Sequence, residues 1–271
     1  MSPKSITDQE KRVLDIVKSN RKFLKAADYD EIEEFFPDVP PDQQKGIQTP
    51  PFQKDCPENA ELIDLVPIEN MSLGKVPLID AIRNRKSHRK FTEGSLTLEE
   101  LSFLLWATQG VRKIDRDQSS EIKAIRRTVP SGGSRHPFET YLIVSRVERL
   151  RPGIYRYLSL DHKLYMMSPA GDDLPQVMKD ICFGQSFAGT SAVLFIWAAI
   201  PYRTEWRYSF TGHKDIAIEA GHICQNLYLA CEAVSSGTCA IAAYDQKEID
   251  KLIGADGIDE FTVYIAPVGK V

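Results

Sequence analysis

An unbroken apolar run near the middle of the second half of the chain restricts the fold more than any other feature. Residues 191–200 read Ser-Ala-Val-Leu-Phe-Ile-Trp-Ala-Ala-Ile, with no charged residue and with several β-branched or aromatic side chains. The run is about half the ~20 residues that a membrane-spanning helix needs. A short apolar run of this composition is typical of a strand buried at the centre of a sheet. We therefore expect a buried central strand here.

The elements expected around this strand are of both kinds. We expect strands at 139–146, 154–158, 164–167 and 261–266, and helices after the capping boxes Thr7/Glu10 and Thr97/Glu100 and at 215–234. The strands in the middle are spaced like hairpins, which favours an α+β fold over a doubly wound sheet. The highly charged residues 111–127 are expected to form a mobile excursion. Gly221, inside the long helix, suggests the close approach of another backbone.

The N-terminal quarter of the chain differs from the rest in composition. Six prolines lie between residues 37 and 57, which excludes a regular helix or a central strand there. The same region contains aromatic residues that a disordered linker would lack. We interpret residues 1–72 as a Pro-rich extension that wraps a surface, and residues 73–271 as the main domain.

Charge and cysteine content exclude several classes of protein. The chain has a formal net charge of -4 and a pI near 5.8, which is not the footprint of a nucleic-acid-binding protein. Its five cysteines form no C-x-x-C pair, and the sequence begins with no charged-then-apolar leader. We therefore expect a cytoplasmic protein that binds neither nucleic acid nor a membrane.

A basic run is the main candidate for ligand binding. Residues 83–91 read Arg-Asn-Arg-Lys-Ser-His-Arg-Lys-Phe, and six of these nine residues are Arg, Lys or His. In an extended segment Arg85, Ser87 and Arg89 would point the same way. Guanidinium groups and a hydroxyl suit a phosphate monoester, so the run is interpreted as the phosphate-binding element of a cofactor. A solvated charged surface is the alternative.

Two further stretches could lie against a ligand. Residues 129–137 contain the adjacent glycines Gly132 and Gly133, which let a backbone come near a ligand, although an ordinary turn explains them equally well. Residues 237–244 are mostly small, which leaves room for a flat molecule or for tight helix packing. There is no dinucleotide-binding, Walker or nucleophile-elbow motif, and no standard metal-ligand spacing. The three stretches together suit FMN better than a dinucleotide.

These stretches resemble the nitroreductase-like FMN flavoproteins. Residues 85–91 are similar to the family's opening Arg-x-Ser-x-Arg-x-Phe motif, and residues 130–137 to its Pro-Ser-Gly-Gly loop. Residues 219–230 resemble its long core helix, and residues 267–270 its closing strand. The resemblance covers about residues 76–271 and is closest to the SagB-type dehydrogenases, some of which oxidise azoline rings in peptide natural products.

The resemblance implies a three-layer fold with a central, mainly antiparallel sheet flanked by helices, and an intertwined homodimer with two shared FMN sites. One subunit would hold the phosphate and ribityl side, and the Pro-Ser-Gly-Gly loop would come from the other. Small residues after the core helix would offer backbone groups near flavin N5. The implied cofactor-binding residues are Arg85, Lys86, Ser87, Arg89, Pro130, Ser131, Gly132, Gly133, Ser134, Ala242, Ala243 and Lys270.

One departure from the family pattern concerns the substrate. Residues 203–208 resemble an azoline-oxidase pattern that ends in Lys-Tyr, but position 207 is Arg, which cannot lose a proton. Arg207 and Tyr208 are the candidate catalytic-site residues, for binding substrate or covering the flavin. Packing against the extension is the alternative.

The function expected from these features is FMN-dependent oxidoreduction. Hydride would pass through flavin N5 from NADH or NADPH to a small acceptor such as a nitroaromatic, a quinone or an unsaturated ring. The alternatives are a dehydrogenase that oxidises a peptide-derived ring and a flavin-binding module without turnover.

Overall fold

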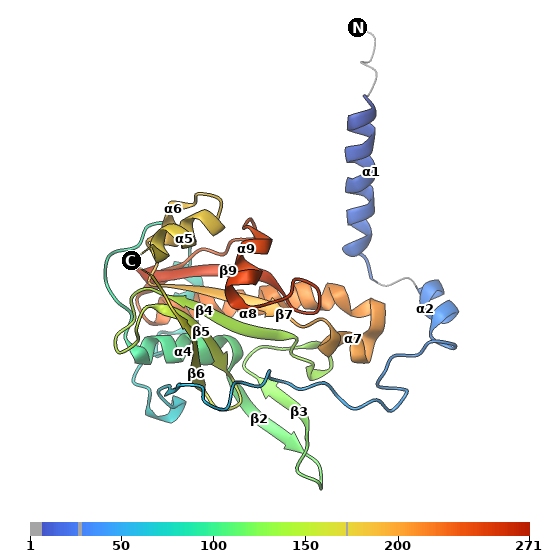
Figure 1. Cartoon of the computed structure of the whole chain (residues 1–271), viewed down its shortest axis with the longest axis horizontal. Helices are drawn as coiled ribbons and strands as arrows, with labels where there is room; N and C mark the ends of the chain where they lie inside the picture. The colour runs from blue at the N-terminus through green and yellow to red at the C-terminus, as the bar shows by residue number, and fades with distance from the viewer. Residues whose placement is uncertain (1–6, 27–28, 172) are drawn as a thin grey trace.

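A seven-stranded sheet forms the centre of the computed structural model, which describes residues 7–26, 29–171 and 173–271 (Figure 1). The strand order is β1-β6-β5-β4-β7-β9-β8, and every pairing between these strands is antiparallel. The strands are β1 (Leu62–Asp64), β4 (Phe138–Val144), β5 (Gly153–Leu158), β6 (Lys163–Pro169), β7 (Val193–Ala199), β8 (Ser236–Thr238) and β9 (Phe261–Lys270).

Strand β7 is buried on both faces, as its apolar sequence predicts. It lies between β4 and β9, and each of its residues is fully buried. Successive side chains of a strand point to opposite faces. Accordingly Val193, Phe195 and Trp197 belong to one hydrophobic cluster, and Leu194, Ile196 and Ala198 belong to another.

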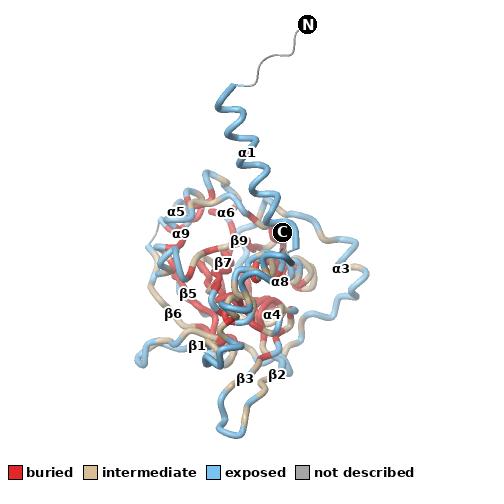
Figure 2. Tube along the Cα trace, turned by 90° about the vertical axis from the view of Figure 1, so that its right-hand side faces the viewer, coloured by how far each residue is buried: buried red, intermediate tan, exposed pale blue. Residues whose placement is uncertain are grey.

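Helices cover both faces of the sheet, which makes the fold three-layered α+β as predicted. On one face α4 (Leu98–Gln109) and α8 (His213–Ala233) bury Leu101, Leu104, Ile223 and Leu227 against the sheet. On the other face α5 (Leu174–Ile181), α6 (Ser186–Gly189) and α9 (Gln246–Ile253) enclose the second cluster. The buried positions lie between these helices (Figure 2). None of the helices described is both long and apolar enough to cross a bilayer.

Local sequence signals place several helix ends correctly. The predicted capping boxes are present at the start of α1 (Asp8–Phe23) and of α4, where Thr97 accepts from the Glu100 amide and Glu100 accepts from the Thr97 amide. Each box satisfies two otherwise unpaired backbone groups. The remaining helical elements are α2 (Tyr29–Phe35), α3 (Leu78–Asn84), α7 (Tyr202–Tyr208) and the short 3₁₀ segments Ile68–Asn70, Gly132–Ser134 and Ser209–Gly212.

Residues 111–127 form an excursion, as expected, but it has regular secondary structure that the sequence did not predict. The segment forms a hairpin of β2 (Val111–Arg116) and β3 (Ile122–Arg127), which extends from the body of the molecule (Figure 1). Ile114 pairs with Ile125 in its register. The Asp115 carboxylate lies 2.6 Å from Lys113 and 3.5 Å from Arg126. The charges that obscured the strand pattern are therefore paired along and across the hairpin.

Gly221 does not meet another backbone within the described chain. It lies on an exposed part of α8, and no atom outside its helix lies within 4 Å of the position that a Cβ would take. Its cost to helix stability, about 1 kcal/mol relative to Ala, is therefore not offset by a contact within one chain.

The N-terminal region has two parts with different relations to the sheet. Helix α1 projects away from the body, and none of its residues is buried (Figures 1 and 2). The following segment, residues 41–66, is here called the strap; it lies along the body and buries Phe52 and Leu65. Strand β1 belongs to the strap, so the sheet includes a strand from the region expected to form the extension.

Buried arginines bind the backbone of the strap. Arg127 Nη2 donates to Phe52 O at 3.0 Å, and Arg156 Nη2 donates to Lys54 O at 3.1 Å and Asp55 O at 2.6 Å. Backbone carbonyl groups of an extended segment outside a sheet have no hydrogen bonds from a neighbouring strand, and the arginine side chains supply donors to three of them. The strap is thus attached to the domain chiefly by polar contacts with arginines that belong to the sheet and the hairpin.

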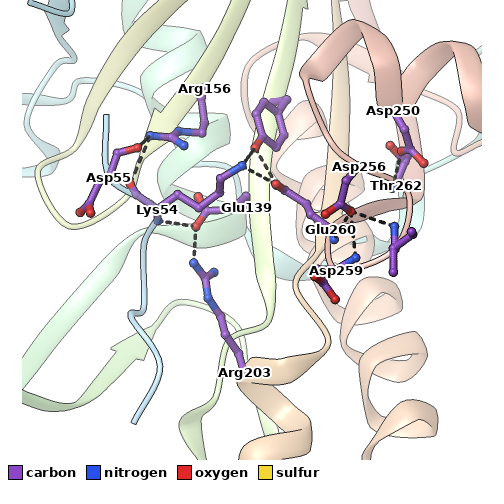
Figure 3. A network of polar contacts seen from close by, with 12 residues as sticks. Lys54, Asp55, Glu139, Arg156, Arg203, Asp250, Asp256, Asp259, Glu260 and Thr262 are labelled. Atoms are coloured by element: carbon purple, nitrogen blue, oxygen red, sulfur yellow. Dashed lines mark hydrogen bonds and ion pairs between the residues drawn. The ribbon is translucent and has the colours of Figure 1, made fainter. Parts of the chain in front are cut away.

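A buried ion pair completes the attachment (Figure 3). The Glu139 Oε1 atom accepts from Arg203 Nη2 at 2.5 Å and from the Lys54 amide at 2.8 Å, and both charged side chains are 3% exposed. Nearby, the Lys54 ammonium pairs with Glu260, which accepts from the Tyr141 hydroxyl at 2.6 Å. Burial, followed by the charge of Glu260, raises the pKa of Tyr141, so this hydroxyl remains a donor.

We predict that Arg203→Met lowers the free energy of unfolding by about 3–5 kcal/mol, because it leaves the Glu139 carboxylate buried without its counter-ion. Urea unfolding followed by circular dichroism measures the change. The control is Arg151→Met, which removes an exposed pair with Glu61 and should cost less than about 1 kcal/mol. Equal effects of the two substitutions would show that the buried Arg203–Glu139 pair is no more important to stability than an exposed pair.

Candidate functional site

The basic run begins where α3 ends and is extended, as expected. Arg85 is the C-cap of α3, and its ψ of 123° turns the chain out of the helix. Ser87 then forms a parallel bridge with Thr238, and the His88 amide donates to Thr238 O at 2.9 Å. The run therefore lies beside β8, at the edge of the sheet.

Four cations of this run lack a carboxylate partner among the described residues: Arg85, Lys86, Arg89 and Lys90. In contrast, Arg83 on the same run pairs with Asp80 at 3.1 Å. Unpaired cations this close together repel one another, and a bound dianion would relieve that repulsion. The residues present therefore fit a phosphate monoester such as that of FMN.

Tyr228 of α8 connects the basic run to the small-residue stretch. Its hydroxyl lies 3.1 Å from Ser87 Oγ and accepts from the Ala240 amide at 2.9 Å, and the Arg85 guanidinium lies 5.4 Å from its ring centroid. The predicted residues Ala242 and Ala243 follow Ala240 and are exposed. Tyr228 was not singled out from the sequence, although it lies within the core-helix motif at 219–230.

His88 and Lys270 differ from the unpaired cations. Burial, then the neighbouring Lys86, lowers the pKa of His88, so its ring is neutral. A Cβ on Gly237 would lie 2.5 Å from the ring, which explains why only glycine suits that position. The Lys270 ammonium pairs with Glu100 and donates to Val234 O at 3.1 Å, so its charge is already compensated.

The Pro-Ser-Gly-Gly loop precedes β4 and contacts the start of α8. The Gly132 amide donates to Glu219 Oε1 at 2.7 Å, and Ser131 Oγ accepts from the His136 amide at 2.8 Å. Gly133 has a φ of 55°, in the left-handed region that favours glycine. The predicted loop residues Pro130 and Gly133 are exposed, whereas Ser131, Gly132 and Ser134 are half-buried.

Arg207 and Tyr208 pack against this loop. A Cβ on Gly133 would lie 2.6 Å from Arg207 Cδ and 2.8 Å from the Tyr208 hydroxyl, so the glycine makes room for both side chains. The Arg207 guanidinium lies 5.5 Å from the Tyr208 ring centroid. The structure thus brings together the candidate catalytic-site residues and the predicted loop, which the sequence alone did not connect.

The neighbouring Trp206 contacts the strap instead. Its indole Nε1 donates to Ile47 O at 2.9 Å, and the Arg135 guanidinium stacks 4.9 Å from its ring centroid. Arg135 in turn donates to Gly133 O at 3.1 Å. Trp206 therefore packs against the N-terminal region, whereas Arg207 and Tyr208 pack against the glycine loop.

The two groups of predicted site residues lie on opposite flanks of α8. Tyr228 contacts the basic run and Glu219 contacts the glycine loop. These residues are nine positions apart, which is about two and a half turns and about 14 Å along the helix axis. Helix α8 therefore lies between the basic run and the loop within one chain.

Glu219 is a titratable group in direct contact with the backbone of the loop. Burial raises its pKa to about 7, and the hydrogen bond from the Gly132 amide opposes that rise. Asp215, one helical turn earlier, raises the pKa further by its negative charge. The carboxyl group therefore changes charge near neutral pH while in contact with the loop backbone.

His213, His222 and Cys224 of α8 do not form a cluster. His213 Nε2 lies 2.7 Å from Glu205 Oε1, His222 is exposed, and Cys224 is buried. Over residues 7–26, 29–171 and 173–271, no group of three or more His, Cys, Asp or Glu residues is placed to hold a metal ion.

Comparisons with known proteins identify relatives of this arrangement. The family model described as Nitroreductase family matches residues 82–270. A Methanocaldococcus jannaschii protein with a provisional nitroreductase name is 28% identical over 207 residues, covering 76% of this chain and 98% of the relative. The matched region includes both the basic run from Arg83 onward and the glycine loop.

Solved structures share the fold at lower identity. An Anabaena variabilis protein, also provisionally named a nitroreductase, aligns with a TM-score of 0.63 and 21% identity over 79% of this chain; the chain spans 42% of its length. The Escherichia coli microcin synthetase McbBCD complex with truncated pro-MccB17 bound aligns with a TM-score of 0.56 and 20% identity, covering 98% of this chain and 95% of that chain.

We predict that Glu219→Gln changes how stability depends on pH. The folded-state pKa of about 7 lies above the carboxyl group's ordinary value of 4.5, so the folded state binds the proton more tightly. The free energy of unfolding of the wild type should therefore fall between pH 5 and pH 8, by on the order of 2–3 kcal/mol relative to the variant.

Urea unfolding at the two pH values measures this difference. Glu148→Gln is the control and should leave the slope of the wild type unchanged, because this exposed carboxylate makes no ion pair with any residue that the structure describes. If wild type and Glu219→Gln show the same pH dependence, the carboxyl group does not titrate in this range.

Proposed function

This chain belongs to the nitroreductase family, and on that premise we propose that it is an FMN-dependent oxidoreductase. The observation that carries the proposal is the set of four unpaired cations around Ser87, in a protein whose formal net charge is -4. Arg85, Ser87 and Arg89 match the Arg-x-Ser-x-Arg motif of the family. A phosphate dianion is the ligand that such a set of donors suits best.

The chain's own residues would bind and orient the cofactor. Arg85 and Arg89 would donate to phosphate oxygens, and Lys86 would add charge. The Ser87 hydroxyl is held toward the same region by Tyr228, whose own position is set by the Ala240 amide. Because Tyr228 is anchored on the longest helix of the domain, the phosphate site would be rigid before the ligand binds.

Other residues would control access to the flavin ring. When bound, FMN would supply a ring that accepts hydride at N5 from NADH or NADPH and passes it to a nitroaromatic, a quinone or an unsaturated ring. The exposed backbone at Ala242 and Ala243 would lie along the ring edge. The glycine loop, with Arg207 and Tyr208 against it, would exclude water and contact the substrate.

We further propose a homodimer in which the loop of one subunit completes the site of the other. Its support is that α8 separates the basic run from the loop within one chain. The exposed flank of α8 at Gly221 would also let a second backbone approach. Multi-angle light scattering should give twice the mass of 30.6 kDa. A flavin-loaded monomer at micromolar concentration would contradict the shared site.

A second candidate function is the oxidation of a peptide-derived ring, as in SagB-type dehydrogenases. The observation that favours it is that the match to a chain of the microcin synthetase complex extends over 98% of this chain, N-terminal region included. Arg207 stands against it, since the pattern it resembles has a lysine there. Bound flavin that NADH and NADPH cannot reduce, but a cyclised peptide can, would favour this candidate over the first.

We predict that Arg85→Ala and Arg89→Ala each weaken FMN binding about ten- to hundred-fold, because each removes a charge-assisted hydrogen bond of about 1.5–3 kcal/mol. Titration of the apoprotein with FMN, followed by flavin fluorescence, measures the dissociation constant. Arg83→Ala is the matched control, since Arg83 lies on the same run but is paired with Asp80. Wild-type affinity in both test variants would remove the basis of the proposal.

We predict that Arg207→Lys lowers kcat/KM at least ten-fold while flavin affinity stays near that of the wild type. The substitution keeps the charge but loses the planar fork that stacks and binds two acceptors. Steady-state kinetics and flavin occupancy are measured on the same sample. If turnover per bound flavin is unchanged, Arg207 serves only to pack against Gly133, and a gain of azoline oxidation would favour the peptide-ring candidate.

A further inference from the structure

A second cavity lies away from the proposed flavin site. It has a volume of about 430 Å³ and is open to solvent on one side. Its lining consists of Asp64, Leu65 and residues 67–69 at the end of the strap and just beyond it, Trp106 of α4, Val111 of β2, and Tyr157 and residues 159–162 around the turn between β5 and β6. None of its lining residues belongs to the basic run or the glycine loop. A cavity of this size holds a small organic molecule.

The charged residues that line this cavity are all acidic. Asp64, Glu69 and Asp161 contribute carboxylates, and no lysine or arginine lines the cavity. Two of the carboxylates have polar contacts, Asp64 with Lys163 at 3.0 Å and Asp161 with Gln53 at 3.3 Å. Glu69 makes no hydrogen bond or ion pair within the described ranges, and its charge acts on the nearby His162 ring. The electrostatic potential of the cavity therefore favours a cation.

A buried hydroxyl independently indicates a polar ligand. Ser159 lines the cavity and is 6% exposed, yet its Oγ has no hydrogen-bond partner among the residues that the structure describes. It follows Tyr157 by two positions at the end of β5, so both side chains point to the face that lines the cavity. A hydroxyl that lines the cavity and makes no hydrogen bond within the described chain can accept one from a ligand N–H.

The histidine in the cavity wall adds no positive charge. His162 Nε2 lies 3.1 Å from Val66 O and must donate to it, so Nδ1 accepts from the Tyr157 hydroxyl at 2.8 Å. Each ring nitrogen thus makes one hydrogen bond, and this pattern of one donor and one acceptor is that of a neutral imidazole. Burial also lowers the pKa of His162, which keeps the ring uncharged. The ring holds the strap against the β5–β6 turn and leaves the cavity acidic.

We infer that this cavity is a binding site for a small organic ammonium ion with an apolar stem. The ammonium group would donate to Ser159 Oγ and be neutralised by Glu69 and Asp161. The stem would lie against Trp106 and Leu65, which belong to the apolar part of the wall. An ammonium group over an aromatic face gains a further cation–π attraction. The site would operate independently of flavin binding.

The test uses 2-phenylethylamine as the probe and 2-phenylethanol as its neutral counterpart, with isothermal titration calorimetry on the flavin-loaded full chain. The amine should bind saturably and at least ten-fold more tightly than the alcohol. Glu69→Gln and Ser159→Ala should each weaken amine binding five- to ten-fold. The matched control is Glu148→Gln, an acid-to-amide change at an exposed position outside the cavity, which should leave the affinity unchanged.

Three results would overturn the inference: no saturable amine binding, equal affinity for amine and alcohol, or amine binding that neither Glu69→Gln nor Ser159→Ala weakens. Glu69 is exposed and makes no hydrogen bond or ion pair within the described chain, so its substitution should not disturb folding; thermal unfolding of each variant verifies this. Repeating the titration with the Arg85→Ala protein, which tests the flavin site, should give the same amine affinity as the wild type.

Discussion

The burial of β7 on both faces is the constraint on which the rest of the structure depends. A strand with apolar side chains on each face needs a helical layer on each side of the sheet, and α4 with α8 supplies one of these layers. Within this layer, Ile223 and Leu227 hold α8 against the sheet. The other two sides of α8 then position Tyr228 beside the basic run and Glu219 beside the glycine loop. The packing of the core thus determines the placement of both halves of the proposed site.

Electrostatic interactions are used in two opposite ways in this protein. In the core, Arg203 is paired with the Glu139 carboxylate, and Arg127 and Arg156 donate to carbonyl groups of the strap, so these buried cations attach the strap to the domain. At the surface, the basic run after α3 is left without carboxylate partners in the described chain. A compensated charge stabilises the fold, whereas an uncompensated group of charges is suited to a ligand that carries the opposite sign.

The glycine loop links the proposed active site to the N-terminal region. Gly133 makes room for Arg207 and Tyr208, and its carbonyl accepts from Arg135, which stacks on Trp206. Trp206 in turn binds the strap at Ile47. A displacement of the strap would therefore be transmitted through Trp206 and Arg135 to the loop. This connection gives the N-terminal region a physical route by which it could influence access to the flavin.

The sequence by itself determined the buried central strand, the capped starts of α1 and α4, the α+β class and the extended basic run, because each depends on local periodicity or on neighbouring residues. It did not predict the β2–β3 hairpin, whose charged residues concealed a strand pattern that cross-strand pairing stabilises. Only the tertiary structure decided that Arg207 and Tyr208 lie against Gly133, that Tyr228 joins Ser87 to Ala240, and that Arg203 neutralises Glu139. These contacts join residues between 12 and 141 positions apart. Such pairings arise from the packing of whole elements, and a local sequence pattern carries no information about them.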